Sequence, residues 1–433
     1  MPALRRLVAM LASPLKSDRG RGGLVIQPYR GYGSTGEVFL MGRVFRQSSL
    51  GSAMRQGTIA RDVLDIMRRL LRWGVRNVTV EARFYGAEQR VTTDRDGYFR
   101  VRVRPARLPD PNRLWHPMEL TLQDPERAAT KMDGKVFVPP ASARFVVISD
   151  IDDTVMRTGV ANKAVMLWRL FVQPARSRIA FPGVAAFYTA LHQGASGAEL
   201  NPMLYVSRAP WSIYDVLEEF FVLHRIPVGP ILFLREWGMT VQSPLPRRAK
   251  DHKLCLIRDM LALYSDLPFI LIGDSGQRDP EIYKQVLREN PGRVLAIYIR
   301  NVSRDVERRR AIEALALKVV EAGGSLLLAA DSLAMAEHAA GHGLIASGAL
   351  VSIAEERFEH VGEADLKPTH DVAGSTRAET LDAVRQGELR PALDPRPGNA
   401  SPPNVVIETQ DSNTMAAPER GHPAQKGRRS EHR

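Results

Sequence analysis

The sequence has a single cysteine and no long apolar run, and both absences narrow what the protein can be. Cys255 stands alone among 433 residues, which excludes an intramolecular disulfide and a cluster of thiolate metal ligands. We expect its thiol to lie in the core. No stretch approaches the roughly eighteen uninterrupted apolar residues of a membrane-spanning helix. The sequence therefore predicts a protein that is not integral to a membrane.

Acidic charge is the scarcer sign in this chain. The 48 acidic residues face 60 lysines and arginines, which gives a formal net charge of +12. A basic balance favours an anionic partner, such as nucleic acid, an anionic membrane surface or a phosphorylated substrate. The sequence shows no recognition motif or aromatic platform for nucleic acid, so we expect no nucleic-acid partner.

The N-terminal segment, residues 1–22, carries two arginines ahead of a short apolar stretch. This pattern superficially resembles a secretion signal, but the stretch is short and Pro14 interrupts it. We expect instead an amphipathic segment that packs on the body of the protein or lies at a membrane surface. The predicted location is cytoplasmic, with peripheral membrane contact.

Residues 23–140 show the period-two alternation of half-buried antiparallel strands, and Pro139 and Pro140 mark their end. An Asp-Gly turn within residues 93–99 predicts a hairpin between two strand patterns. We expect a small antiparallel β-sandwich, whose hairpin resembles those of transthyretin-like or carboxypeptidase-regulatory-like modules. It would act as a scaffold or docking domain, because it holds no nucleophile or metal-ligand constellation. Strands are predicted at 38–40, 78–84 and 98–103, and a helix at 60–73.

Residues 141–350 alternate strand and helix patterns, which predicts a doubly wound α/β domain. Residues 351–433 lose this periodicity and become rich in proline, asparagine, serine and charge, so we expect a largely disordered tail. The predicted strands are 145–149, 203–207, 230–234, 269–273, 294–299 and 325–329, and the predicted helices are 184–192, 211–224, 250–264, 280–289 and 306–322.

The first of these strands ends in acid. An uninterrupted apolar run predicts a strand that is buried on both faces, and Asp150, Asp152 and Asp153 follow it directly. Aspartate is common in turns and caps, but clustered carboxylates behind a buried strand repel one another and resist desolvation. Because open α/β sheets bind ligands at the carboxyl ends of their strands, the pattern indicates a site.

Other strand ends carry groups suited to phosphate chemistry. Ser207 and Arg208 follow one strand and would contact a phosphate, although Ser207 alone is equally typical of a helix cap. A second acidic cluster, Asp274 and Asp279, follows another buried strand and would complete an oxygen-rich site for Mg²⁺. Asp279 is alternatively the N-cap of the helix that follows it. Lys253 opens a helix between the two acidic strand ends, where it would neutralise carboxylate and phosphoryl charge.

These residues resemble the four motifs of haloacid dehalogenase superfamily phosphatases, in their order and at the expected strand ends. Longer stretches resemble the actin-patch-protein type of Mg²⁺-dependent phosphatidate phosphatase over roughly residues 28–347. The resemblance implies a Rossmann-like catalytic phosphatase domain with Mg²⁺ as cofactor. The stretches are ISDIDDTVMRTGV, YVSRAPW, HKL and FILIGDSGQRDPEIY, together with RGYG in residues 23–140.

The resemblance also implies roles for individual residues. Asp150 would be the nucleophile that forms an aspartyl-phosphate, Asp152 the acid and then the base, and Thr154 the residue that orients the loop. Ser207, Arg208 and Lys253 would bind the phosphoryl group. Mg²⁺ would be held by Asp150, the backbone carbonyl of Asp152 and Asp274, with Asp279 in or just behind its ligands. Asp153 receives no role, and we expect it to be exposed or structural.

Residues 161–178 join apolar side chains to arginines and leave no room for a large cap domain. They would either contact a lipid interface or pack as a core helix over the sheet. The predicted function is hydrolysis of phosphatidate to diacylglycerol and phosphate, with a phospholipid or membrane-surface substrate. The alternatives are a phosphatase of a soluble phosphoester or phosphoprotein, and a non-catalytic membrane or protein adaptor on the same fold.

Overall fold

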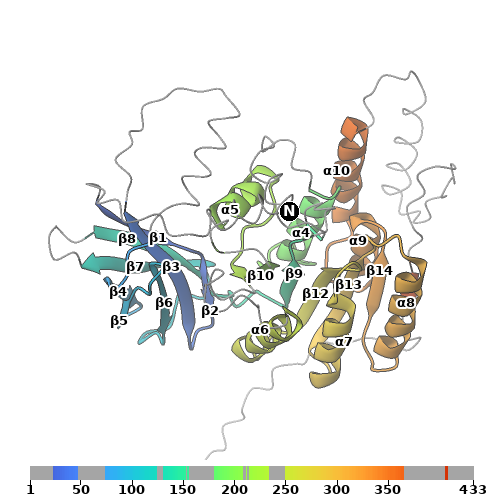
Figure 1. The fold of residues 1–433 in the computed structure, drawn as a ribbon. Helices are drawn as coiled ribbons and strands as arrows, with labels where there is room; N and C mark the ends of the chain where they lie inside the picture. The colour runs from blue at the N-terminus through green and yellow to red at the C-terminus, as the bar shows by residue number, and fades with distance from the viewer. Residues whose placement is uncertain are drawn as a thin grey trace, which may run out of the picture.

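The computed structural model describes the two sheets and the helices that pack on them. The chain is mixed α/β, as predicted (Figure 1). The N-terminal segment, the helix at 60–73, residues 161–178, Asp153 and Arg208 lie outside the described residues, as does most of the predicted tail. The described residues are 23–46, 74–123, 130–152, 154–155, 180–207, 211, 214–233, 249–364 and 405–407.

The first sheet is built from residues 24–137 and has eight strands. Its neighbours pair antiparallel except for β2 and β8, which are parallel. The period-two alternation of β6, whose apolar side chains are buried while its two arginines are exposed, places every second residue in a shared core. The strands are β1 Leu24–Pro28, β2 Gly31–Gly33, β3 Val38–Arg46, β4 Thr79–Phe84, β5 Ala87–Thr92, β6 Tyr98–Val103, β7 Trp115–Gln123 and β8 Thr130–Phe137.

The Asp-Gly turn forms as predicted, but it does not join a hairpin. Gly97 has a φ of 81° and donates its N–H to the carbonyl of Asp94. The flanking strands then pair elsewhere, because β5 pairs with β4 and β6 pairs with β3. The tight hairpin lies one turn earlier, where Tyr85 and Gly86 have φ values of 44° and 82° between β4 and β5. Positive φ at both positions is the geometry of a two-residue hairpin turn.

The second sheet has seven strands in the order β11-β10-β9-β12-β13-β14-β15. Its first six strands are parallel, so their carboxyl ends meet at one edge. β9 and β12 are buried along their whole length, which agrees with their uninterrupted apolar sequences. The strands are β9 Val146–Asp150, β10 Met203–Ser207, β11 Ile231–Phe233, β12 Phe269–Asp274, β13 Val294–Arg300, β14 Leu326–Ala329 and β15 Val405–Ile407.

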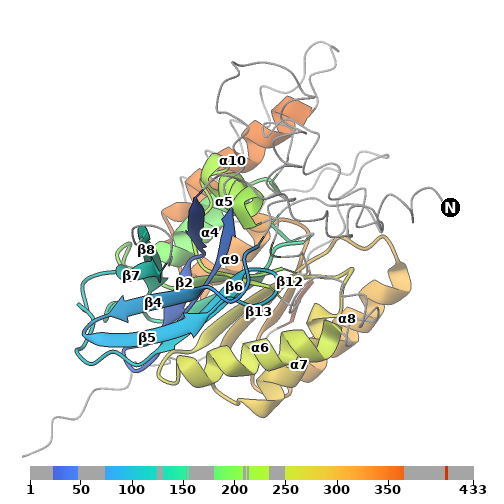
Figure 2. The same cartoon turned by 60° about the vertical axis from the view of Figure 1, so that its left-hand side comes forward.

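Helices cover both faces of the second sheet. One face packs against α4, α5, α9 and α10 and the other against α6, α7 and α8, which lie together in Figure 2. Each of the two faces therefore has its own apolar core. The helices are α4 Val184–Gln193, α5 Tyr214–Leu223, α6 Ala249–Leu263, α7 Asp279–Glu289, α8 Val306–Val320, α9 Ser332–Gly341 and α10 Ala349–Ala364.

Three features of the C-terminal half differ from the sequence analysis. Helix α10 runs through the boundary expected at residue 350, and β15, from within the predicted tail, pairs antiparallel with β14. Cys255 is exposed on α6, so the prediction of a core thiol was wrong. The apolar face of α6 is formed by Leu254, Ile257 and Leu261, and position 255 lies about 100° around the helix from 254.

Candidate active site

Asp150 is the last residue of β9, the strand between β10 and β12. Its side chain is fully buried. The sheet fixes its height, because Asp150 pairs in register with Val206 of β10, one residue before Ser207. Ser207 is itself fully buried at the end of β10. The parallel topology thus brings the predicted nucleophile and the predicted phosphate contact to neighbouring strand ends, as expected from the sequence.

Lys253 forms ion pairs with carboxylates of both acidic clusters. Its Nζ donates to Asp150 Oδ1 at 2.8 Å and to Asp279 Oδ1 at 2.6 Å, and none of the three side chains is exposed. The ammonium also lies 5.4 Å from the ring centre of Tyr283 on α7, within the range of a cation–π contact. A surface lysine is excluded, and Lys253 has the position between the carboxylates that the sequence predicted.

Asp279 is part of the cluster and not the N-cap of α7. The helix begins at Asp279 itself, after Arg278, and the carboxylate turns inward to accept from Lys253 and, at 3.3 Å, from the backbone N–H of Asp274. Gly273 makes room for it, because a Cβ at that position would lie 2.3 Å from Asp279 Oδ2. The glycine of the Gly-Asp pair is therefore required by the side chain that folds back over it.

Three buried carboxylates converge at this edge of the sheet. Asp150, Asp274 and Asp279 each present an oxygen, and these oxygens lie within 4.8 Å of one another. Asp274 Oδ1 accepts the backbone N–H of Gln277 at 2.8 Å, which orients the side chain. Three carboxylates face the single ammonium of Lys253, so the described cluster carries excess negative charge. Oxygen donors at this spacing fit a hard divalent cation.

The pKa shifts report the same imbalance. Burial raises the pKa of the Asp150 carboxyl well above 3.8, and the ammonium of Lys253 opposes that rise. The neighbouring carboxylates of Asp279, Asp152 and Asp274 raise it further. Burial also disfavours the charged form of Lys253, but Asp150 and Asp279 raise its pKa well above 10.5. The lysine is therefore held as a cation, and a second cation would favour ionised Asp150.

Gln277 is a site residue that the sequence analysis missed. Its side-chain Nε2 donates to Asp150 Oδ2 at 2.9 Å and to the backbone carbonyl of Asp152 at 3.1 Å. These are two of the oxygens that the resemblance assigns to the metal. Glutamine is common in surface loops, so its type gave no signal. Its place between Asp274 and Asp279, inside one acidic motif, is the signal that would have found it.

The loop after Asp150 is held from the opposite side by Arg300. Arg300 is buried at the end of β13, and its Nε donates to the carbonyl of Thr154 at 3.1 Å while Nη2 donates to Ser332 Oγ at 2.8 Å. Thr154 is fully buried, and its Oγ1 has no hydrogen-bond partner among the described residues. Asp152 is partly exposed. The structure thus gathers Asp150, Thr154, Ser207, Lys253, Asp152, Asp274 and Asp279 at the carboxyl edge of one sheet.

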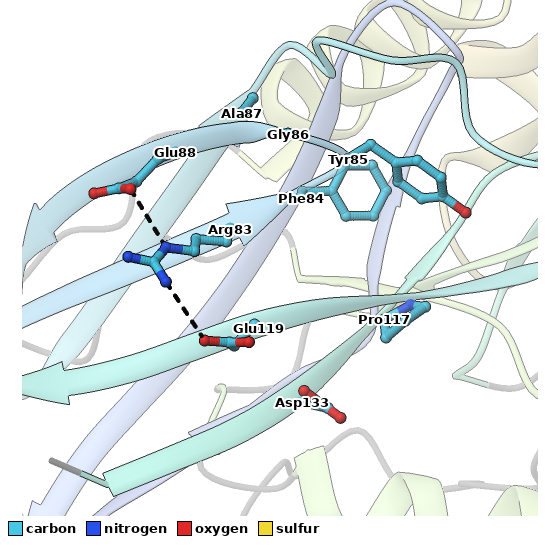
Figure 3. A pocket seen from close by; sticks show the side chains of 9 residues that line it. All are labelled: Arg83, Phe84, Tyr85, Gly86, Ala87, Glu88, Pro117, Glu119 and Asp133. Atoms are coloured by element: carbon cyan, nitrogen blue, oxygen red, sulfur yellow. Dashed lines mark hydrogen bonds and ion pairs between the residues drawn. The ribbon is translucent and has the colours of Figure 1, made fainter.

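A separate cavity of about 490 Å³ opens on the first sheet around the β4–β5 hairpin (Figure 3). Arg83 lies within it, 3.3 Å from Glu88 and 4.0 Å from Glu119. Its lining holds one arginine and three carboxylates without a buried convergence of the kind seen at Asp150, and none of the residues predicted for catalysis lines the cavity. The carboxylate cluster of the second sheet is therefore the stronger candidate site. Among the described residues, no helix combines the length and the apolar character needed to cross a bilayer.

Comparisons with known proteins single out the part of the chain that carries the cluster. Residues 145–301 match the family model described as phosphatidate phosphatase APP1, catalytic domain. Phosphatidate phosphatase APP1 of Saccharomyces cerevisiae is 33% identical over 155 residues, which cover 36% of this chain and 25% of that protein. An uncharacterized protein of Schizosaccharomyces pombe is 29% identical over 163 residues, covering 37% and 25%. The matches span about a quarter of the length of these curated relatives.

A carbohydrate acetylesterase from Xanthomonas citri aligns over 67% of this chain and 72% of its own, with a TM-score of 0.23 and 12% identity, which is too slight to bear on fold or function. The sequence matches are more specific, because their range runs from the start of β9 to the end of β13 and contains every residue of the carboxylate cluster. Residues 145–301 are thus the part of the chain that is similar to the catalytic domain of APP1-type phosphatidate phosphatases.

Proposed function

We propose that the chain is a Mg²⁺-dependent phosphatase that works through an aspartyl-phosphate and hydrolyses phosphatidate to diacylglycerol and phosphate. The observation that carries this proposal is the buried arrangement of Asp150, Lys253, Asp274 and Asp279 at the carboxyl edge of the second sheet. Desolvated carboxylates destabilise a fold unless they are paired or serve a reaction. The arrangement lies inside the segment that matches the APP1 catalytic domain.

In the proposed first step, a carboxylate oxygen of Asp150 attacks the phosphorus atom and the phosphorus–oxygen bond to the alcohol breaks. Asp152, which is partly exposed, gives its proton to the departing oxygen. In the second step Asp152 takes a proton from water, the water oxygen bonds to phosphorus, and the acyl-phosphate bond breaks. Phosphate leaves and the Asp150 carboxylate is restored.

Lys253 and Ser207 would hold the phosphoryl group during both steps. The Lys253 ammonium already lies 2.8 Å from Asp150 Oδ1, so it offsets charge on the nucleophile and on the phosphoryl oxygens that approach it. Ser207 at the neighbouring strand end would donate a hydrogen bond to a phosphoryl oxygen, and Arg208 would add positive charge. Thr154 would keep the loop in place through the hydrogen bond between its carbonyl and Arg300.

The donor set fits Mg²⁺ as the divalent cation. Asp150, the carbonyl of Asp152 and Asp274 would hold it, with Asp279 close behind. When bound, it would reduce the repulsion between the anionic nucleophile and the anionic substrate. The excess of carboxylates over ammonium groups in the described cluster supports this assignment, because one cation of charge two restores the balance that Lys253 leaves incomplete.

The substrate is tested by comparing phosphate release from phosphatidate in mixed micelles with release from a soluble aryl phosphate. We expect micellar phosphatidate to be preferred and turnover to stop when EDTA removes Mg²⁺, with recovery on adding the ion back. Turnover of the soluble ester alone would keep the chemistry and assign a soluble phosphoester as substrate. Absence of turnover on both, with Mg²⁺ present, would favour a non-catalytic adaptor.

Replacing Gln277 with leucine is expected to weaken catalysis without removing it. The change deletes both donors that orient Asp150 Oδ2 and the Asp152 carbonyl, so we expect kcat to fall about ten-fold and the Mg²⁺ concentration for half-maximal activity to rise by a similar factor. Isothermal titration calorimetry with Mn²⁺ measures the affinity directly. Gln285→Leu on the exposed side of α7 is the matched control, since Gln285 bonds only to Glu289 among the described residues. Equal Mn²⁺ affinity in wild type and Gln277→Leu would contradict the assignment.

A further inference from the structure

The motif Tyr-Arg-Gly-Tyr-Gly, residues 29–33, includes strand β2 of the first sheet. Its side chains also pack against helices that cover the second sheet. We call residues 29–33 the bridging segment. Tyr29 is 4% exposed and belongs to the apolar core under α4, α5, α9 and α10, not to the core of its own sheet. Figure 1 shows β2 at the side of the first sheet that faces the second sheet. The proposed mechanism gives this motif no role.

Tyr29 contacts two aromatic side chains that follow β10 in the sequence. Its ring stacks on Trp211, with ring centres 5.1 Å apart and planes at 22°, and it lies 4.4 Å from the ring of Tyr214 at the start of α5. Trp211 is also 4.4 Å from Phe233 at the end of β11. Trp211 is therefore packed between two aromatic rings, four residues along the chain from Ser207. Aromatic contacts of this kind restrict where Trp211 can lie.

Arg30 fixes helix α5 at two further points. Its backbone N–H donates to Tyr214 Oη at 2.9 Å, and its Nε donates to Glu218 Oε1 at 2.5 Å. The guanidinium lies 5.0 Å from the ring centre of Trp115 in β7, which keeps the side chain against its own sheet. A hydrogen bond between Gln27 and Asp215 adds another link between β1 and α5. These contacts hold α5, the helix that follows β10 in the sequence, against the first sheet.

Tyr32 contacts the other catalytic element, α6. Its ring packs against the core under α6, α7 and α8. Burial raises the pKa of Tyr32 to about 12, and the carboxylate of Asp259 on α6 contributes. Asp259 lies six residues after Lys253 on the same helix. Gly31 and Gly33 allow the close strand contacts that present Tyr32, since a Cβ at either position would lie 2.5 Å or less from a backbone carbonyl oxygen of the first sheet.

We propose that the bridging segment positions Ser207 and Lys253 relative to each other, so that the first sheet is part of the phosphoryl-binding unit. It contacts α5 through Tyr29 and Arg30 and α6 through Tyr32. Helix α5 follows β10, which ends at Ser207, and helix α6 carries Lys253. Asp150 and Asp274 instead end the strands β9 and β12. The proposal rests on the roles proposed for Ser207 and Lys253.

The test uses three variants: Tyr29→Leu, Trp211→Leu and the double variant that combines these two changes. The control is Phe99→Leu. Phe99 is as deeply buried as Tyr29 but lies in the first sheet's own core, so it reports the effect of destabilising that sheet alone. Three quantities are measured on a soluble aryl phosphate: kcat, the inhibition constant of inorganic phosphate, and the Mg²⁺ concentration for half-maximal activity. Hydrogen exchange of residues 203–207 and 214–223 supplies a readout that needs no turnover.

For Tyr29→Leu and Trp211→Leu we expect kcat to fall and the phosphate inhibition constant to rise about ten-fold, with the Mg²⁺ requirement unchanged. The double variant should lose little more than either single one, because the two rings act through one contact. Amide exchange in 203–207 and 214–223 should accelerate in these variants and not in Phe99→Leu. Unaltered exchange there, or the same kinetic losses in Phe99→Leu, would overturn the proposal. A wild-type protein without turnover would refute the proposed function alone, and the exchange data would still decide whether the segment positions the Ser207 strand and α5.

Discussion

Replacing Asp150 with asparagine is expected to abolish Mg²⁺-dependent phosphate release while leaving the fold intact. The amide keeps the shape of the side chain, and Lys253 retains its 2.6 Å contact with Asp279, so the buried ammonium is not left alone. An amide cannot form the acyl-phosphate, and removal of a nucleophile lowers turnover by about a thousand-fold or more. Phosphate release is measured on micellar phosphatidate and on the aryl phosphate.

The control for this variant is Asp266→Asn, an equally small change on an exposed turn between α6 and β12. It should leave turnover at the wild-type level. Thermal unfolding of Asp150→Asn should occur near the wild-type temperature. Burial raises the pKa of the Asp150 carboxyl, so ionisation of this group does not stabilise the folded state, and its replacement by an amide removes no such contribution. Substantial activity in a folded Asp150→Asn protein would rule out Asp150 as the nucleophile.

Replacing Lys253 with methionine is expected to cost both activity and stability. The change removes the buried ammonium that lies between Asp150 and Asp279 and leaves their carboxylates without a cation. Breaking a buried ion pair on one side typically costs about 3–5 kcal/mol of unfolding free energy, and we expect no detectable turnover. Denaturant unfolding measured without divalent cations gives the free energy of unfolding.

The pH dependence of the Lys253→Met variant has a definite sign. Lys253 lowers the pKa of Asp150 against the effect of burial, so its removal should raise that pKa further. A carboxyl with a raised pKa in the folded state destabilises the fold once the pH exceeds its unfolded value, and the penalty disappears as the pH falls. The stability difference from wild type should therefore be larger at about pH 8 than at about pH 5. Lys318→Met, an exposed change on α8, is the control, and a deficit that grows as the pH falls would contradict the charge assignment.

The sequence predicted the parallel sheet well because burial there leaves a direct mark. β9, β10 and β12 are continuous apolar runs, and their predicted bounds agree with the structure within one residue. The position of Lys253 also followed, since a helix between two strands of a parallel sheet opens near their carboxyl ends. The hydrophobic pattern of the sequence does not predict the direction in which a side chain points. Asp279 had two interpretations until the structure showed its carboxylate turned inward.

The residues that were missed act through contacts between distant segments. Gln277 reaches Asp150 across 127 positions of sequence, and Arg300 reaches Thr154 across 146. Neither residue type is unusual in a loop or at a strand end, so nothing local distinguishes them. The hairpin predicted at residues 93–99 was wrong for the same reason. Turn chemistry predicts a reversal of the chain but not which strand will be the neighbour, and β6 pairs with β3.

Strand β15 gives the parallel sheet an outer margin that comes from far along the chain. Val405–Ile407 pair antiparallel with Leu326–Leu328 of β14, residues about eighty positions earlier, and occupy the backbone groups on that side. An uncovered edge of this apolar composition is a template for pairing with a second molecule. The stretch that composition alone assigned to a disordered tail thus covers this edge, and its removal would leave the β14 backbone open to pairing with another strand.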